Sequence, residues 1–383
     1  MKKKKICLLG STGSIGKQTL EVIDAHPDLF EAYVLTANSQ ADLLIQQARK
    51  FNPCAVVIAD EKHYDHVRES LSDLPIQVYA GEDALCQVVQ MGTIDIVLTA
   101  LVGFSGLRPT ISAIKAKKPI ALANKETLVV AGELITALCL ENHVPLLPVD
   151  SEHSAIFQSL MGESSAIEKI ILTASGGPFR LFSMEQLQDV TPAQALKHPN
   201  WDMGAKITID SASMMNKGFE VIEAKWLFDV TPEQIQVVVH PQSIVHSAVQ
   251  FEDGAVKAQL GAPDMRVPIQ LAISYPERLQ SDFPRIDWWQ MADLTFHKPD
   301  LQKFRCLQLT YEAIRMGGSA PCVLNAANEV VNLAFRQGRC KFLQMADVIE
   351  QTLSKVDLVA QPTIEDYLQI DKASRVIAQE LLK

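Results

Sequence analysis

Short apolar runs alternate with helical patterns along the first part of the chain. Continuous apolar runs such as KICLLG, EAYVLTA and CAVVIAD predict buried strands. Between them, segments such as KQTLEVIDAHPDLF and ADLLIQQARKFN carry apolar residues at helical spacing. Strands separated by helices of this length form right-handed βαβ units. The pattern therefore predicts an α/β fold with a Rossmann-like, doubly wound parallel sheet, which binds nucleotides at its strand ends.

The pattern changes after residue 149, and we expect four regions. Residues 1–149 would form the nucleotide-binding domain, and 150–275 a central α+β catalytic domain. Within the latter, FEDGAVKAQLGAPDMRV predicts a hairpin that could extend a sheet across a dimer. Residues 276–304 are rich in proline and tryptophan without periodicity, which indicates a linker. Residues 305–383 follow a helical pattern and predict a C-terminal helical bundle.

Composition and charge narrow the class of protein. Of the 383 residues, 48% are hydrophobic and 21% charged, as in an ordinary globular protein. The formal net charge is -10 and the sequence has no basic stripe, which argues against a protein that binds nucleic acid. No run of about 18 apolar residues occurs, so no membrane span is expected. The seven scattered cysteines lack any C-x-x-C pair and are typical of reduced thiols, which predicts a cytoplasmic location.

A glycine-rich loop, GSTGSIG, follows the first predicted strand. Gly10, Gly13 and Gly16 have the spacing G-x-x-G-x-x-G instead of the commoner G-x-G-x-x-G, but they stand between a strand and a helix as that fingerprint requires. Glycines permit a tight turn and a close approach of the backbone, while Thr12, Ser14 and the helix N-terminus offer donors to a pyrophosphate. A plain glycine turn is the alternative. In this context we predict a nucleotide site.

The end of the second predicted strand usually distinguishes NAD from NADP. An acidic residue there holds the ribose 2′-hydroxyl, and a basic residue holds the 2′-phosphate. This chain has Asn38, Ser39 and Gln40 at that place, none of them charged. The missing carboxylate favours NADP weakly.

Two carboxylates stand close together in the segment PVDSEHSAIFQ. On an extended chain Asp150 and Glu152 would project to the same side. Two anions held so close would share a proton or share a divalent cation such as Mg²⁺ or Mn²⁺. The alternative is an acidic turn at the start of a helix, because Asp and Ser are ordinary N-cap residues.

A second polar cluster follows in the middle of the chain. Ser175 leads into two glycines, a flexible loop whose hydroxyl and amides suit an anion. Ser211, Asn216 and Lys217 together look like a phosphate cradle. Glu220 lies three residues after Lys217 and so on the same side of a predicted helix, although an exposed Lys–Glu helix pair is the alternative.

Between these segments, His198 to Gly204 predict a loop that could close over a ligand. Trp201 lies within it, and the alternative for this residue is a core aromatic. The loop contains Pro199 and ends in glycine, which disfavours a continuous helix.

Together with ALANKE, VVVHPQSIVHSAV and GAPDMRVPI, these segments occur in the order seen in the 1-deoxy-D-xylulose 5-phosphate reductoisomerase family, which the chain resembles over nearly its whole length. That family uses NADPH and a divalent metal, Mg²⁺ or Mn²⁺, to convert 1-deoxy-D-xylulose 5-phosphate to 2-C-methyl-D-erythritol 4-phosphate by rearrangement and hydride reduction. The reaction commits carbon to isoprenoid precursors by the non-mevalonate pathway. The resemblance implies an NADP-dependent oxidoreductase acting on a phosphosugar, and we expect a homodimer.

The resemblance also assigns roles to individual residues. The metal ligands would be Asp150, Glu152 and Glu220, and the catalytic set adds Lys125 as the electrostatic partner of a developing alkoxide. The substrate-binding residues would be Ser151, Glu152, Ser175, His198, Trp201, Ser211, Asn216, Lys217 and Glu220, of which His198 and Trp201 belong to a lid. The NADPH-binding residues would be Gly10, Thr12, Gly13, Ser14, Ile15, Gly16, Asn38, Ser39, Gln40, Asn124, Glu126 and Gly204.

The chain departs from the family at the end of the second predicted strand. After the second strand the family commonly carries the tripeptide Gly-Lys-Asn or Gly-Arg-Asn, whereas the segment ANSQ of this chain has no basic residue. We therefore expect a weaker preference for NADP over NAD.

Two rival functions are considered. One rival is another metal-assisted oxidoreductase of phosphorylated substrates, or an isomerase without net redox change. The other is a nucleotide-binding sensor without chemistry, which is disfavoured because Asp150, Glu152, Lys217 and Glu220 are all present.

Overall fold

The computed structural model of the chain consists of two compact units. The structure describes residues 3–197, 201, 203–289, 291 and 293–383. Unit 1 consists of residues 1–127, 135–151 and 264–283, and unit 2 of residues 128–134, 152–263 and 284–383. Each unit is therefore assembled from segments that are far apart in the sequence.

Unit 1 is built on a parallel seven-stranded sheet with the strand order β4-β3-β2-β1-β5-β6-β7. Residues 6–9 of β1 and all of β3 are apolar and fully buried, as expected of a doubly wound sheet that helices cover on both faces. The strands are β1 (Lys4–Leu9), β2 (Phe30–Ala37), β3 (Ala55–Ile58), β4 (Gln77–Ala80), β5 (Ile96–Thr99), β6 (Ile120–Leu122) and β7 (Leu146–Pro148). The predicted α/β class is confirmed.

Helices connect the strands of this sheet in sequence. They are α1 (Ser14–Ala25), α2 (Ala41–Phe51), α3 (Tyr64–Ser70), α4 (Glu82–Val88), α5 (Leu107–Lys115) and α6 (Glu126–Asn142), with short 3₁₀ helices η1 (Glu61–His63) and η2 (Gly103–Gly106). Helix α12 (Arg266–Ser274) comes from much later in the chain and packs against α1. The carboxyl ends of the strands and the loops that follow them form the edge at which such sheets bind nucleotides.

Unit 2 contains a mixed four-stranded sheet with the order β11-β10-β8-β9. Strands β8 and β9 are parallel, whereas β10 is antiparallel to both β8 and β11. The strands are β8 (Ile167–Ala174), β9 (Ile235–Val239), β10 (Val245–Phe251) and β11 (Val256–Leu260). The predicted hairpin is confirmed as β10 and β11, with a turn at Gly254, whose φ is 86°. The expected continuation of its second strand towards Arg266 is wrong, because α12 begins there.

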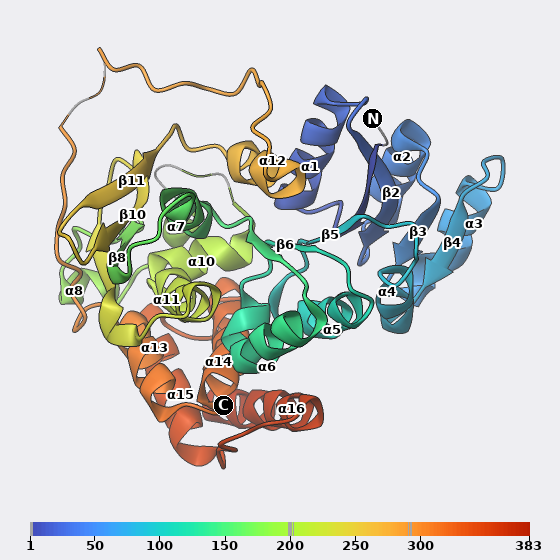
Figure 1. Cartoon of the computed structure of the whole chain (residues 1–383). Coiled ribbons are helices and arrows are strands. Elements are labelled where there is room, and N and C mark those ends of the chain that lie inside the picture. Colours follow the sequence, from blue (N-terminus) through green and yellow to red (C-terminus); the bar gives the residue numbers. More distant parts are fainter. Residues whose placement is uncertain (1–2, 198–200, 202, 290, 292) are drawn as a thin grey trace. The chain divides into compact units, whose positions relative to one another are not determined.

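The helices of unit 2 fall into two groups. The first accompanies the sheet: α7 (Ser151–Leu160), α8 (Met184–Leu187), α9 (Pro192–Ala195), α10 (Ala205–Ala212) and α11 (Met215–Phe228), with the 3₁₀ helix η3 (Pro232–Gln234). The second, orange to red in Figure 1, is the C-terminal bundle of α13 (Arg305–Met316), α14 (Ala320–Arg336), α15 (Phe342–Lys355) and α16 (Ile364–Leu381). The predicted helical bundle is confirmed. Across the described residues, no helix has the length and the apolar character that a membrane span needs.

Candidate active site

Three charged side chains from two helices of unit 2 converge at one point. Glu152 lies in the first turn of α7, while Lys217 and Glu220 lie one turn apart on α11. The Lys217 Nζ donates to Glu152 Oε1 at 2.6 Å and also to Glu220 Oε2. Lys217 and Glu220 are both buried. Burial by itself would lower the pKa of Lys217, but the two carboxylates outweigh burial and raise the pKa.

The other oxygen of Glu220 is also engaged. Asn216 Nδ2 donates to Glu220 Oε1 at 2.5 Å, so the carboxylate is held by two consecutive residues of its own helix. Because both partners come from the first turn of α11, the orientation of Glu220 depends on this helix start. The predicted cluster of Asn216, Lys217 and Glu220 is therefore one local structure.

Asp150 directly precedes helix α7 and belongs to unit 1, near the end of the segment 135–151. Its Oδ1 accepts a hydrogen bond from the Ser151 backbone amide at 2.9 Å, and its Oδ2 lies 2.5 Å from Lys125 Nζ. The chain turns helical at Ser151, so the expected extended geometry for Asp150 and Glu152 is wrong and the alternative, a helix start, is right. Both carboxylates then lie at a helix N-terminus, whose free amides favour negative charge.

The chemistry of these donors fits a divalent cation. Carboxylate oxygens are the ligands that Mg²⁺ and Mn²⁺ prefer. Within unit 2 the Lys217 ammonium already lies against the carboxylates of Glu152 and Glu220, and within unit 1 the Lys125 ammonium lies against that of Asp150. Glu220 is buried and Glu152 is partly buried, and carboxylates withdrawn from water require a cationic partner. A metal bound to Glu152 and Glu220 would share that role with Lys217.

Two of the predicted phosphate-binding segments contact each other within unit 2. The loop Ser175–Gly176–Gly177 follows β8, and both glycines have positive φ, 80° and 67°. Ser175 Oγ accepts a hydrogen bond from the Gly177 amide at 3.2 Å. A Cβ atom added to Gly177 would lie 2.7 Å from the Ser211 carbonyl oxygen, so the loop packs directly on α10 at that residue. The loop that begins with Ser175 therefore contacts the backbone of Ser211, and α11 with Asn216 is separated from the end of α10 by two residues.

The structure describes only part of the predicted lid. Trp201 is half buried, with its ring centroid 6.2 Å from that of His246 on β10, and Gly204 directly precedes α10. His198 lies outside the described residues. The contact with β10 gives Trp201 a place beside the second sheet.

The glycine-rich loop of unit 1 connects β1 to α1. Gly10 has φ 86°, and a Cβ atom added to Gly16 would lie 2.2 Å from the Gly10 carbonyl oxygen, so this tight turn requires glycine at both positions. Gly13 precedes the helix without a capping side chain, and Gly13 and Ser14 are exposed while Thr12 is buried. The first amides of α1 are thus available to an anion, as a pyrophosphate site needs.

The loops that follow β2 and β6 complete this edge of unit 1. Asn38, Ser39 and Gln40 are exposed. Asn124, after β6, is buried and donates to the carbonyl oxygens of Leu101 and Gly103, at 2.9 and 3.1 Å, and to Glu126 Oε2 at 3.0 Å. Asn124 thus ties together the loops that follow β5 and β6.

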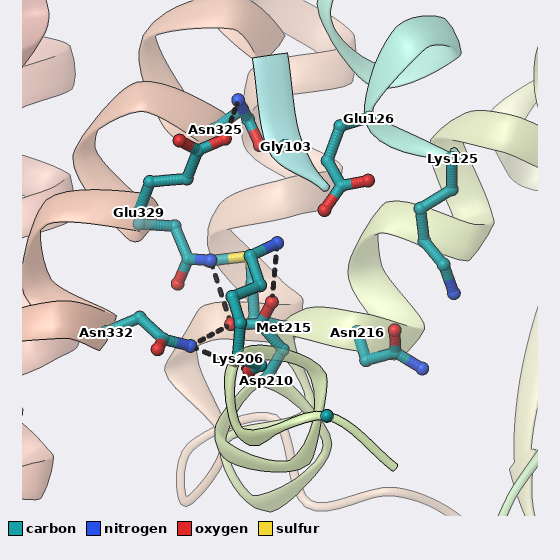
Figure 2. Close-up of polar contacts among 12 residues, drawn as sticks. Gly103, Lys125, Glu126, Lys206, Asp210, Met215, Asn216, Asn325, Glu329 and Asn332 are labelled. Atoms are coloured by element: carbon teal, nitrogen blue, oxygen red, sulfur yellow. Dashed lines mark hydrogen bonds and ion pairs between the residues drawn. The ribbon is translucent and has the colours of Figure 1, made fainter. Parts of the chain in front are cut away.

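Sequence reasoning missed Asp210, the residue before Ser211. Its buried carboxylate accepts hydrogen bonds at Oδ1 from Asn328 Nδ2 at 2.9 Å and from Asn332 Nδ2 at 2.8 Å. Its Oδ2 pairs with Lys206 Nζ at 2.8 Å, and Figure 2 shows Asp210 together with Lys206 and Asn332. The two asparagines belong to α14, one helical turn apart. Only this spacing and the neighbouring Ser211 could have suggested the network, because nothing in the sequence pairs α10 with α14.

A buried pair behind Glu220 was also missed. His153 Nδ1 lies 3.3 Å from Glu223 Oε2, and His153 Nε2 lies 2.9 Å from the Glu220 carbonyl oxygen. Both side chains are fully buried. The signal was Glu223 standing three residues after Glu220, on the same side of α11.

Comparisons with known proteins cover almost the whole chain. Family models described as 1-deoxy-D-xylulose 5-phosphate reductoisomerase, its C-terminal domain, and DXP reductoisomerase C-terminal domain match residues 6–132, 146–228 and 260–377. The 1-deoxy-D-xylulose 5-phosphate reductoisomerases of Bacteroides thetaiotaomicron and Phocaeicola vulgatus are 65% and 66% identical to the chain. The alignments cover 100% and 99% of this chain and 98% and 99% of those proteins.

Solved structures agree. The reductoisomerase from Zymomonas mobilis in complex with NADPH has a TM-score of 0.93 at 40% identity, covering 100% of both chains. A DOX-P reductoisomerase in complex with NADPH, fosmidomycin and magnesium also has a TM-score of 0.93, at 38% identity, covering 99% of this chain and 98% of that one.

Proposed function

Because the chain belongs to the 1-deoxy-D-xylulose 5-phosphate reductoisomerase family, we propose that its carboxylate, serine–glycine and strand-end residues perform that family's reaction. The protein is an NADP-dependent oxidoreductase that uses NADPH and a divalent cation. It converts 1-deoxy-D-xylulose 5-phosphate to 2-C-methyl-D-erythritol 4-phosphate. The observation that carries the site assignment is the pairing of Glu152 and Glu220 across the Lys217 ammonium.

We assign the metal ligands as Asp150, Glu152 and Glu220. Glu152 and Glu220 already share one cationic partner, and chain continuity keeps Asp150 beside Glu152 at the start of α7. A bound divalent ion supplies Lewis acidity, which stabilises negative charge on adjacent substrate oxygens while a carbon–carbon bond breaks and re-forms. Lys125, paired with Asp150, provides a second positive charge near a developing alkoxide.

The substrate phosphate has its own residues in this proposal. Ser175 and Ser211 offer hydroxyl groups from the loop after β8 and from α10, and Asn216 and Lys217 offer donors from the first turn of α11. A phosphate fixed there anchors one end of the substrate, so that the reacting carbons are held in place for both steps. Ser151, at the start of α7, is assigned to a substrate hydroxyl, and Trp201 and His198 to the lid.

The cofactor is assigned to the strand-end edge of unit 1. The pyrophosphate would lie on the amides after Gly10, at the N-terminus of α1. Asn38, Ser39 and Gln40 would contact the adenosine end, and Asn124 and Glu126 the nicotinamide end, with Gly204 and Ile15 as further contacts. NADPH then supplies the hydride that reduces the rearranged aldehyde to the alcohol.

Three finer assignments belong to the same proposal. The working metal is Mg²⁺ or Mn²⁺, because both accept carboxylate ligands. The location is the cytoplasm, because all seven cysteines are free thiols. The assembly is a homodimer: β11 is an edge strand whose Val256 side chain is 53% exposed, and light scattering should give about twice the chain mass of 42.3 kDa.

The metal assignment is tested by titrating the protein with Mn²⁺ and following the free ion by electron paramagnetic resonance. Glu220→Gln keeps the shape of the side chain but removes its charge, and we expect Mn²⁺ affinity to fall about tenfold or more and turnover to collapse. Glu252→Gln, an exposed residue of the same unit, is the matched control and should leave both unchanged. Unaltered Mn²⁺ binding in Glu220→Gln would show that the ion is held elsewhere.

A further inference from the structure

The adenosine end of the cofactor edge lacks a positive charge where one is expected. The 2′-phosphate that distinguishes NADPH from NADH is normally held by a basic residue just after the second strand. Asn38, Ser39 and Gln40 occupy that position and are neutral. The protein uses NADPH, and a cation supplied by another element would strengthen binding of the 2′-phosphate at this point.

The loop after β3 runs directly beside the loop after β2. Beyond the paired strands, the Ala59 amide donates to the Ala37 carbonyl and the Asp60 amide to the Asn38 carbonyl, each at 2.9 Å. Parallel pairing thus continues one residue past the end of β2. Neighbouring strands lie about 4.8 Å apart, so the residues that follow Asp60 flank the position expected for the 2′-phosphate.

Lys62 is held at this place by the local structure. It is the central residue of η1, which begins at Glu61, and its amide donates to Asp60 Oδ1 at 3.2 Å. Asp60 therefore caps η1 and fixes the backbone of Lys62 two residues beyond the pairing with Asn38. The side chain is exposed and carries its ammonium on a long flexible stem.

The lysine is also uncommitted among the described residues. No ion pair involves its ammonium there, whereas Arg68 pairs with Asp65 at 3.1 Å and Arg49 with Asp73 at 2.8 Å. These arginines already have carboxylate partners, so Lys62 is the better candidate for a phosphate.

The acidic neighbours of Lys62 are directed elsewhere. Glu61 lies against Gly81, close enough that a Cβ atom there would be 2.7 Å from Glu61 Oε1. Gly81 follows β4, on the opposite side of β3 from β2. Asp42, in the first turn of α2, lies 2.8 Å from His66 Nε2.

We propose that Lys62 is the residue that selects NADPH over NADH, by binding the 2′-phosphate from the loop after β3 in place of the basic residue absent after β2. The inference rests on the proposed cofactor edge and adds to it a residue that no resemblance supplied. Ser39 contributes a neutral hydrogen bond to the same phosphate, and Lys62 contributes the charge. The weaker NADP preference expected from ANSQ alone is thereby offset.

The test measures the dissociation constants of NADPH and NADH by quenching of protein fluorescence in the intact protein and in Lys62→Ala. A charge-assisted hydrogen bond to phosphate corresponds to about a 10- to 100-fold loss of NADPH affinity, with NADH affinity within about twofold of the parent. Competition by adenosine 2′,5′-bisphosphate, which lacks the nicotinamide, should weaken by the same factor. Lys115→Ala, an exposed lysine in the last turn of α5, is the control and should change neither.

Two further results decide the matter. Adding Ser39→Lys to Lys62→Ala should restore NADPH affinity, because a basic residue then follows β2, where the family commonly carries one. Turnover at saturating NADPH should be retained in Lys62→Ala. Loss of NADPH affinity with turnover retained therefore tests the role of Lys62 independently of the proposed function. Equal NADPH affinity in Lys62→Ala and the parent, or a parallel loss of NADH affinity, would overturn the proposal.

Discussion

At the scale of single residues, the charges of the candidate site converge on Lys217. One ammonium group serves two carboxylates from different helices, and both Lys217 and Glu220 are buried. The spacing of Lys217 and Glu220 predicted that they share a helix face. Their contact with Glu152 could not be predicted from spacing, because it joins α11 to the start of α7 through the tertiary fold. The family resemblance had placed Glu152, Lys217 and Glu220 in one site because it assigned them to metal and substrate binding.

Gly16 permits a specific test of the cofactor loop. In Gly16→Ala, the new methyl group would lie 2.2 Å from a backbone oxygen, which cannot move as a flexible side chain could. We expect the loop to shift, at a cost of about 1–3 kcal/mol in the free energy of unfolding, and NADPH binding to be lost. Gly92→Ala is the control, because nothing lies within 4 Å of its added Cβ atom. Calorimetric titration with NADPH would contradict this expectation if Gly16→Ala bound like the parent.

At the scale of elements, sequence patterning was most successful for buried strands and for long helices. It predicted β1, β2 and β3 and the four C-terminal helices, because their apolar residues follow one period throughout. It missed β4, a short edge strand whose side chains are partly exposed, and α4, which has only seven residues. For α7, the sequence allowed both an extended segment and a helix start; the chain is helical from Ser151, whose amide donates to Asp150 Oδ1.

Helix α14 positions the phosphate site through α10. Asn332 donates both to Asp210 Oδ1 and to the Lys206 carbonyl, at 2.8 and 2.9 Å, and it is fully buried. In Asn332→Leu, the Asp210 carboxylate would lose a donor inside the protein, which should cost about 1–3 kcal/mol in the free energy of unfolding. Because Ser211 follows Asp210, KM for the phosphosugar should rise more than kcat falls.

Urea unfolding and steady-state kinetics measure these two effects. Gln351→Leu, an exposed residue on α15, is the matched control and should leave both unchanged. A stability equal to that of the parent protein in Asn332→Leu would show that the network contributes nothing. A loss of kcat at unchanged KM would contradict the positioning of Ser211.

Tyr311 links helix α13 to strand β9 in a pH-dependent way. Its hydroxyl donates to the Ile235 carbonyl at 3.2 Å, and burial raises the pKa of Tyr311 from 10.0 to about 12. Since the folded pKa exceeds the unfolded one, the stabilising contribution is present below pH 10 and is lost as pH rises to about 12. The loss should be about 2–3 kcal/mol.

The difference in unfolding free energy between the parent protein and Tyr311→Phe isolates this effect from the titration of other groups. The parent should lose stability relative to Tyr311→Phe between pH 10 and about 12. A constant difference over that interval would contradict the assigned burial of the hydroxyl.

At the scale of the whole molecule, the sequence carries its chemistry in two sets of segments. One set, at the strand ends of unit 1, has the geometry of a nucleotide site, and the other, in unit 2, combines carboxylates with a phosphate loop. The alternation of strands and helices predicted the first set. The residue types suggested parts of the second set, but joining these parts into one site depended on resemblance, because the residues come from α7, α10, α11 and the loop after β8, which no periodicity connects.

The central claim is that one protein performs a carbon rearrangement and a hydride reduction on the same phosphosugar. The most direct measurement supplies 1-deoxy-D-xylulose 5-phosphate, Mg²⁺ and NADPH deuterated at the transferred position, and follows the product by nuclear magnetic resonance. We predict 2-C-methyl-D-erythritol 4-phosphate with one deuterium at the newly formed alcohol carbon, one NADPH consumed per product, and no product after chelation of the metal. A rearranged product without deuterium and without NADPH consumption would contradict the account and indicate a redox-neutral isomerase.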